Sequence, residues 1–154
     1  MAAPLKKSWR FGFQAIDWQR TQDSSMCAAG YAARRILVVD DEPFVCDALK
    51  MMLAFDGHEV FTAANGAEAL AAYDRQPFDL VITDFAMPKM KGDELAAAIK
   101  ARNPQQPVVM ITAYAEMLES SGNPLKGVDF ILSKPFFLEN LREAIAKTVP
   151  ARQA

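Results

Sequence analysis

The sequence contains little cysteine and little histidine, the residues on which many metal and disulfide sites depend. Cys27 and Cys46 supply the two thiols among 154 residues, and His58 is the sole imidazole. Two isolated cysteines have neither the spacing of a zinc site nor the density of a disulfide scaffold, which favours the reducing cytoplasm. We expect His58, close to the start of a predicted strand, to have a structural role.

The sequence also lacks long hydrophobic runs and a strong excess of one charge. No apolar run reaches the roughly 18 residues of a membrane span, and no signal-peptide core follows Lys6 and Lys7. The net charge is −2, with six basic and two acidic residues among the first 35, so the remainder carries −6. A weakly acidic body argues against nucleic acid as the main partner.

Apolar residues are nevertheless frequent enough for one folded domain. Hydrophobic residues make up 51% of the chain and charged residues 23%, a mixture typical of globular domains. We predict a domain over residues 35–150, preceded by an N-terminal extension over residues 1–34. The extension adds large apolar side chains to its basic residues: Trp9, Phe11, Phe13, Ile16 and Trp18. It is a flexible tail, an over-long start with true initiation near Met26, or a peptide that docks on a partner or a membrane surface.

Short apolar runs of β type alternate with helical patterns along the predicted domain. The β-type runs cover residues 36–39, 59–63, 80–83, 108–112 and 128–132. The helical patterns are marked by Leu49 and Leu53, residues 67–73, Leu95 and Ile99, residues 113–121, and Leu141 and Ile145. Pro43 suits a first helical position, and Asn65, three residues before Glu68, suits an N-cap. Five such units predict an α/β fold, a doubly wound five-stranded parallel sheet of the flavodoxin-like order 2-1-3-4-5.

Carboxylates follow two of the predicted strands. Asp40 and Asp41 come directly after residues 36–39, and Asp84 follows residues 80–83. In the predicted order these strands are neighbours from which the chain winds in opposite directions, and ligand sites form at that point. Clustered carboxylates repel one another unless a cation balances them, and an all-oxygen site suits Mg²⁺. The sequence therefore predicts a magnesium site. Glu42 is either part of this site or a cap of the next helix.

Thr112 and Lys134 stand at the ends of the fourth and fifth predicted strands. A metal ion, a hydroxyl and an ammonium can each contact one oxygen of a tetrahedral anion. The anion most often handled together with Mg²⁺ is a phosphoryl group. Asp84 is the carboxylate best placed to attack it, which would give an aspartyl phosphate.

These strand ends resemble the receiver domains of bacterial two-component response regulators. The motifs are VVDDE with Asp40 and Asp41, DFAMPKMKG from Asp84 to Gly92, ITAY with Thr112, and SKPF with Lys134 and Pro135. Each motif is weak alone, but four in order, each at the end of its own strand, make a specific signal. The resemblance covers essentially the whole predicted domain.

The resemblance implies that Asp84 accepts a phosphoryl group from a phosphohistidine of a sensor histidine kinase or a histidine phosphotransferase. It implies a magnesium site made of Asp40, Asp41, Asp84 and the backbone carbonyl of Ala86. Thr112 and Lys134 would contact the phosphoryl oxygens, and the bond between Lys134 and Pro135 would be cis. Gly92 would permit a turn that a side chain would hinder. Such a chain is a phosphoacceptor that catalyses only its own phosphorylation and dephosphorylation.

The sequence departs from the family at the position three residues before the lysine. The family usually has an aromatic residue there that changes rotamer with the threonine, whereas this chain has Ile131. Phe130 is adjacent, but strand alternation points it to the other face. Ala86 and Tyr114 stand where side chains gate the attacking water and offer it no hydrogen-bonding partner, so we expect slow self-dephosphorylation.

The chain ends soon after the last predicted helix, so we expect a single-domain regulator without a DNA-binding domain. Its output would be a protein–protein contact of the face formed by residues 113–121, residues 128–132 and the last helix. A first alternative is a pseudo-receiver that signals without phosphate. A haloacid-dehalogenase-type phosphatase needs a second acid where Ala86 stands, and a flavodoxin needs a phosphate-binding loop after the first strand that the sequence does not have.

Overall fold

The computed structural model describes residues 32–122 and 125–150. In this part of the chain, strands and helices alternate strictly. The strands are β1 (Arg35–Val39), β2 (Glu59–Ala63), β3 (Leu80–Asp84), β4 (Val108–Thr112) and β5 (Phe130–Ser133). The helices are α2 (Pro43–Phe55), α3 (Gly66–Arg75), α4 (Gly92–Arg102), α5 (Ala115–Ser120) and α6 (Leu138–Thr148).

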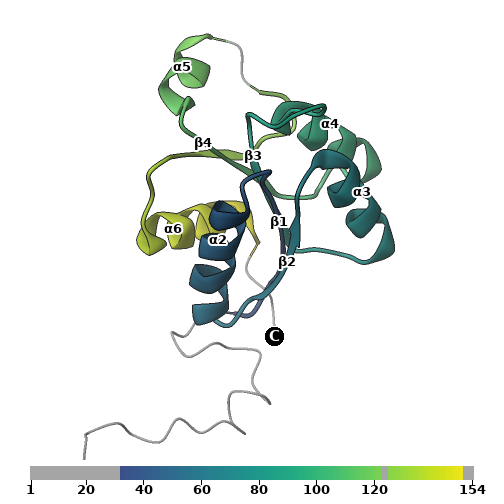
Figure 1. The fold of residues 1–154 in the computed structure, drawn as a ribbon, viewed down its shortest axis with the longest axis vertical. Helices are drawn as coiled ribbons and strands as arrows, with labels where there is room; N and C mark the ends of the chain where they lie inside the picture. Colours follow the sequence, from purple (N-terminus) through teal and green to yellow (C-terminus); the bar gives the residue numbers. More distant parts are fainter. Residues whose placement is uncertain (1–31, 123–124, 151–154) are drawn as a thin grey trace, which may run out of the picture.

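The five strands form one parallel sheet in the order β2-β1-β3-β4-β5. Helices α2 and α6 cover one face of the sheet and helices α3 and α4 cover the other, with α5 beyond the carboxyl end of β4 (Figure 1). The predicted fold class and strand order are confirmed. The registers place Val39 beside Thr83, so β1 and β3 end side by side.

Alternate residues of each strand enter two separate cores. In β1, Ile36 and Val38 belong to the core under α2 and α6, while Leu37 and Val39 belong to the core under α3 and α4. All four side chains are at most 1% exposed. A strand buried on both faces is apolar without interruption, which is why these runs are recognisable in the sequence.

The helix starts follow the local signals in the sequence. Pro43 occupies the first turn of α2, where its missing N–H leaves no bond unmade. Asn65 caps α3, and its side-chain oxygen accepts a hydrogen bond from the backbone N–H of Glu68 at 2.9 Å. The carboxylate of Glu68 reaches back to the N–H of Ala64 at 2.9 Å. Both sequence predictions are confirmed.

The last strand differs from its predicted range. It begins at Phe130 and not at residue 128, and it continues to Ser133. Gly127 has a φ of +85°, so the chain turns there, and the N–H of Val128 bonds back to Leu125. Because of this turn, the strand begins two residues later than predicted.

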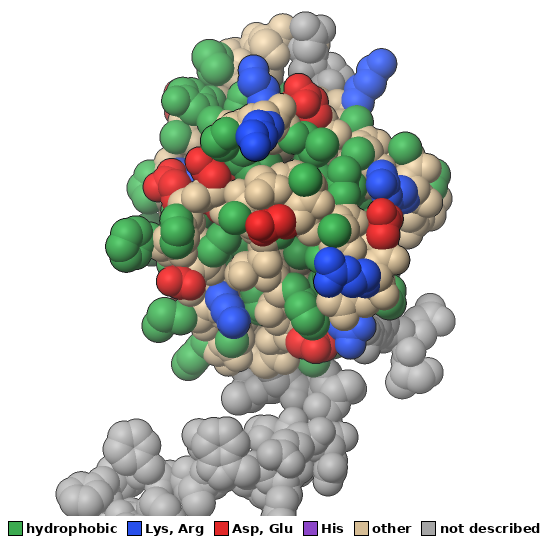
Figure 2. Space-filling model, turned by 45° about the vertical axis from the view of Figure 1, so that its right-hand side comes forward, with side chains coloured by type: hydrophobic (Ala, Val, Ile, Leu, Met, Phe, Trp, Pro, Cys, Tyr) green, Lys and Arg blue, Asp and Glu red, His purple; other side chains and the backbone are tan. Residues whose placement is uncertain are grey.

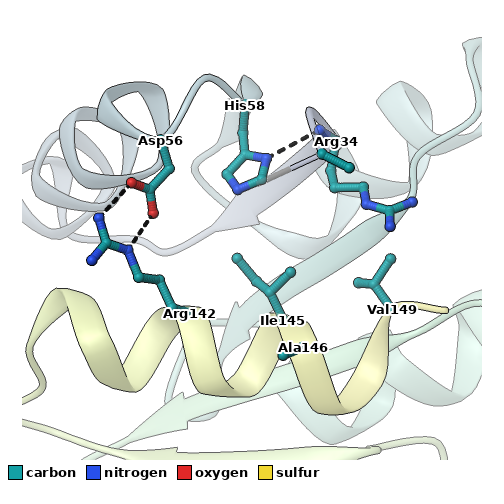
Figure 3. A pocket seen from close by; sticks show the side chains of 8 residues that line it. Arg34, Asp56, His58, Arg142, Ile145, Ala146 and Val149 are labelled. Atoms are coloured by element: carbon teal, nitrogen blue, oxygen red, sulfur yellow. Dashed lines mark hydrogen bonds and ion pairs between the residues drawn. The ribbon is translucent and has the colours of Figure 1, made fainter. Parts of the chain in front are cut away.

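A cavity of about 250 Å³ lies at the amino-terminal side of the sheet, between the end of α2 and helix α6 (Figure 3). Arg142 of α6 donates two hydrogen bonds to Asp56, at 2.7 and 2.8 Å. His58 lies beside this pair, and its Nδ1 accepts the backbone N–H of Arg34 at 3.0 Å. His58 is 7% exposed, which agrees with the structural role expected from the sequence.

The folded contacts begin before residue 35. Arg34 is buried, and its guanidinium donates to the carbonyl of Pro150 at 3.0 Å. The two interpretations of the N-terminal extension concern residues that are almost all outside the described part of the chain, because that part begins at Ala32.

Charges of both signs are interspersed over the face that carries α3 and α4 (Figure 2). No single-sign patch dominates this face. None of the helices in the described part of the chain has the length and hydropathy needed to cross a bilayer.

Candidate functional site

Three carboxylates meet where β1 and β3 end. Asp40 and Asp41 follow β1, and Asp84 is the last residue of β3. One oxygen from each of the three lies within 4.8 Å of the others. Asp40 and Asp84 are buried, at 2% and 6% exposure, whereas Asp41 is exposed. The structure thus brings together the three acids that the sequence predicted to converge.

The backbone around Asp40 fixes the direction of its side chain. Its N–H extends the sheet by donating to the carbonyl of Ala63 at 3.1 Å. Its Oδ1 accepts the N–H of Glu42 at 2.9 Å, and its own carbonyl accepts the thiol of Cys46 at 3.3 Å. These bonds fix the side chain of Asp40, whose Oδ2 lies 3.5 Å from the ammonium of Lys134.

Gly92 allows the loop after Asp84 to fold back on β3. A Cβ at this position would overlap the carbonyl oxygen of Asp84 and lie 3.0 Å from the Cα of Phe85. The N–H of Gly92 donates to the carbonyl of Phe85 at 2.9 Å. The expectation that a side chain would be hindered here agrees with this geometry, and the reason is close approach to the backbone of Asp84.

Lys134 reaches across the sheet to the buried acids. Its Nζ lies 3.3 Å from Oδ1 of Asp84 and 3.5 Å from Oδ2 of Asp40. Its backbone N–H donates to the carbonyl of Thr112 at 2.9 Å, and its bond to Pro135 is cis, as predicted. The lysine is therefore anchored to the end of β4 while its ammonium contacts groups at the ends of β1 and β3.

The charges of the cluster influence one another. Burial raises the pKa of the Asp40 and Asp84 carboxyls above their ordinary values, and the Lys134 ammonium opposes that rise. Burial would lower the pKa of Lys134, but the two carboxylates outweigh it and the pKa is raised. Two buried acids with one shared ammonium form a site in which a further cation would be stabilised.

Thr112 is fully buried at the end of β4. Its Oγ1 accepts the backbone N–H of Tyr114 at 3.0 Å. Tyr114 is half-exposed and is the N-cap residue of α5. The hydroxyl of Thr112 is therefore linked directly to the start of that helix, and its own proton remains available to an acceptor.

The remaining predicted residues, Ala86 and Glu42, are exposed to solvent. Ala86 is exposed two residues after Asp84. Glu42 is exposed at the N-cap position of α2, but its side chain makes no capping hydrogen bond. Glu42 therefore occupies the capping position that one alternative predicted, but its side chain does not cap the helix.

The donor set fits a hard divalent cation. The cluster offers carboxylate oxygens and no thiol or imidazole among the described residues, which is the chemistry that Mg²⁺ and Ca²⁺ require and zinc does not. The exposure of Asp41 leaves one side open to water. Mg²⁺ usually retains several waters beside one or two carboxylates, so an open cluster is appropriate to it.

One support of this region was not recognisable from the sequence. The thiol of Cys46 supports Asp40 from inside α2, and no motif marks it. Phe130 packs against the core under α6, and Lys147 lies over its ring at 5.7 Å. Ile131 is half-buried and lines a surface hollow together with Leu118 and Leu125, to which Phe130 also contributes.

Comparison with known proteins supports this arrangement. A family model described as the response regulator receiver domain matches residues 36–146. The response regulator protein PilR of Pseudomonas aeruginosa is 38% identical over 120 residues, which are 77% of this chain and 27% of PilR. The transcriptional regulatory protein TcrA of Mycobacterium tuberculosis is 37% identical over 107 residues, 70% of this chain and 42% of TcrA. The chain thus spans less than half of the length of these relatives.

Solved structures agree with the family model. A receiver domain protein of Methanospirillum hungatei has a TM-score of 0.68 and 34% identity, over 75% of this chain and 92% of that one. The response regulator TrrA of Thermotoga maritima, solved in complex with Mg²⁺ and BeF, has a TM-score of 0.65 and 37% identity, over 74% and 97% of the two chains. With the sheet order, the strand-end acids and the family match in agreement, the chain belongs to the response regulator receiver domains of two-component systems.

Proposed function

We propose that this chain is a response regulator receiver that accepts a phosphoryl group on Asp84. The observation that carries the proposal is the meeting of Asp40, Asp41 and Asp84 within reach of the Lys134 ammonium. The donor would be a phosphohistidine of a histidine kinase or a histidine phosphotransferase. A carboxylate oxygen of Asp84 forms the new O–P bond, the P–N bond of the donor breaks, and the electron pair returns to the histidine nitrogen.

The residues of the chain have separate tasks in this transfer. Lys134, already 3.3 Å from Asp84, stabilises negative charge on the transferred group. The hydroxyl of Thr112 donates a hydrogen bond to a second phosphoryl oxygen. Such a reaction needs positioning and electrostatic stabilisation more than covalent chemistry, and buried groups on rigid strand ends provide both.

Asp40, Asp41, Asp84 and the carbonyl of Ala86 would hold Mg²⁺. When bound, the ion supplies positive charge that offsets the repulsion between the acids and the incoming phosphoryl oxygens. The carboxylate donor set described above supports this assignment, and Asp41 is the member that water can reach.

The output would be a protein–protein contact made by α5, β5 and α6. The hydrogen bond between Thr112 and Tyr114 supports a direct route from the phosphoryl site to α5 that does not use an aromatic residue at position 131. The buried free thiol of Cys46 is compatible with the cytoplasmic location that we propose.

The test is labelling of Asp84 with acetyl phosphate and Mg²⁺, followed by intact mass spectrometry. We expect the wild-type chain to gain one phosphoryl group and Asp84→Asn to gain none, because an amide cannot form the acyl phosphate. Glu42→Gln, an exposed neighbour outside the cluster, is the matched control and should be labelled normally. Full labelling of Asp84→Asn would disprove the assignment.

A pseudo-receiver that binds partners without phosphate is the second candidate. The observation in its favour is Ile131 at the usual aromatic position. The same labelling experiment separates the two, because a pseudo-receiver with an intact fold gives no phosphorylated product even in the wild-type chain.

A further inference from the structure

Helix α2 has apolar side chains on both of its faces. Cys46, Leu49 and Leu53 are buried against the sheet. On the opposite side, Phe44, Met51 and Phe55 are 86%, 74% and 71% exposed. A helix that covers a sheet normally presents polar residues to water. An apolar outer face is instead typical of a surface that binds something.

The three exposed residues lie along one side of the helix, and we call them the outer stripe of α2. They are spaced by seven and four residues, so they lie on the same side of the helix, one above another. The remaining large exposed hydrophobic residues of the described chain lie on other elements: Tyr114, Met117 and Phe137. Three of the six large exposed hydrophobic residues of the described chain therefore lie on α2.

The described chain begins at one end of the outer stripe. Ala32 lines the same cavity as Asp56, which is the C-cap residue of α2 and follows Phe55 (Figure 3). The backbone N–H of Arg34 bonds to His58, two residues beyond that cap. Residues 1–31 are thus attached beside the carboxyl end of α2.

The attached segment has the length and the composition to cover the stripe. Eleven residues separate Phe44 from Phe55, which is about 16 Å along a helix. The 14 residues from Trp18 to Ala32 can span up to about 45 Å when extended. The segment is rich in aromatic residues between Trp9 and Trp18, and residues 1–31 carry four basic and two acidic side chains.

The charge of the segment is opposite to that at the amino-terminal end of the outer stripe. The N-cap residue Glu42 and Asp47 of α2 are exposed there, Lys50 is exposed farther along the helix, and the segment has a net charge of +2. A tethered segment also has a high effective concentration at its own domain, so weak contacts are enough to keep it bound.

We propose that residues 1–31 dock on the outer stripe of their own domain, with the aromatic side chains between Trp9 and Trp18 against Phe44, Met51 and Phe55. The segment then acts as an intramolecular cover for α2, and a partner that uses this face must displace it. The inference goes beyond the proposed function, because docking requires no phosphoryl transfer.

The chain offers a direct test, since Trp9 and Trp18 are its two tryptophans and both lie in the segment. Their fluorescence in the full chain should be shifted to shorter wavelength and quenched by acrylamide several-fold less efficiently than in the urea-unfolded chain. The double variant Met51→Ser with Phe55→Ser should restore quenching to the unfolded level. Dilution should leave the wild-type signal unchanged, because the contact is intramolecular.

A matched control removes the same residue types elsewhere. Met117 and Phe137 are 59% and 72% exposed, and Met117→Ser with Phe137→Ser should leave the tryptophan signal unchanged. Circular dichroism checks that each variant is folded. If the α2 variant does not fold, Phe11→Ser with Phe13→Ser, which alters the segment alone, should give the same increase in quenching.

Four results would overturn the proposal. The first is wild-type tryptophan quenching equal to that of the unfolded chain. The second is an equal response of the α2 variant and the control variant. The third is shielding that disappears on dilution, which would indicate a second copy as the occupant. The fourth is shielding that arises only when vesicles of phosphatidylglycerol and phosphatidylcholine are added, which would indicate a membrane surface.

Discussion

Burial and a hydrogen bond to Nδ1 both favour the neutral form of His58. Its Nδ1 accepts the N–H of Arg34, which requires that nitrogen to be unprotonated. Burial lowers the pKa of His58 below its ordinary value, while Asp56 acts in the opposite direction. The unfolded chain therefore binds more protons than the folded chain at pH values below the ordinary pKa of 6.5.

This histidine should make the domain less stable in mild acid. The contribution of His58 is fully present above about pH 6.5 and is lost as the pH falls below it, by at most about 1.4 kcal/mol per pH unit. His58→Asn retains an acceptor for Arg34 and cannot titrate. The measurement is the urea midpoint of both proteins between neutral pH and about pH 5.5.

The comparison with the His58→Asn variant is needed because Asp40 and Asp84 have the opposite effect on the pH dependence of stability. Their raised pKa values make the folded state more stable as the pH falls. The difference between wild type and His58→Asn isolates the histidine. Parallel pH profiles for the two proteins would show that His58 does not titrate in this way.

The acids of the site could be predicted at the residue scale, whereas their supports could not. Asp40, Asp41 and Asp84 are recognisable because parallel strands end at one edge and each acid follows an apolar run. The contact between Gly92 and the backbone of Asp84 depends on how a loop folds back. The bond from Cys46 to Asp40 follows no sequence periodicity.

At the scale of elements, an ion pair joins the end of α2 to α6. Asp56 is 1% exposed and accepts two hydrogen bonds from Arg142. A buried carboxylate that loses its partner is left charged in a poorly solvated position, and such losses are large. The pair between Arg102 and Asp74 has similar distances, 2.7 and 3.3 Å, but its side chains are 39% and 54% exposed.

These two pairs should respond very differently to the same substitution. We expect Arg142→Met to lower the free energy of unfolding by about 3 kcal/mol. Arg102→Met should change it little, because water replaces an exposed partner. Urea unfolding of both variants measures the difference, and equal losses would mean that burial does not set the strength of the pair at Asp56.

The order and type of the elements could be predicted from the sequence, because continuous apolar strands and helical spacing of apolar residues are strong local signals. The start of β5 could not, because the turn at Gly127 is a tertiary feature of the connection. The pairing of Asp56 with Arg142 could not be predicted from the sequence either, because 86 residues separate them.

At the scale of the whole molecule, metal binding should stabilise the fold. A ligand that binds the folded state at ten times its Kd adds about 1.4 kcal/mol, which is roughly 4 °C in Tm for a domain of this size. We expect Mg²⁺ to raise the Tm of the wild-type chain and to have much less effect on Asp41→Asn. Differential scanning calorimetry with and without Mg²⁺ measures this.

Asp41 is suited to this test because it is exposed, so its replacement should leave the metal-free fold intact. Glu42→Gln is the control for the loss of one neighbouring charge. If Asp41→Asn and the wild-type chain gain the same Tm with Mg²⁺, the ion binds elsewhere.

The hydrogen bond from Arg34 to Pro150 has a practical meaning for protein engineering. It joins two residues close to the ends of the described part of the chain, on the side of the sheet opposite the acids. A short linker between these positions would therefore close the chain into a ring without distorting it. The exposed turn at Gly122, where even an added Cβ would meet nothing within 4 Å, then offers a place to open new termini, so the domain is a natural candidate for circular permutation and for insertion into a host protein.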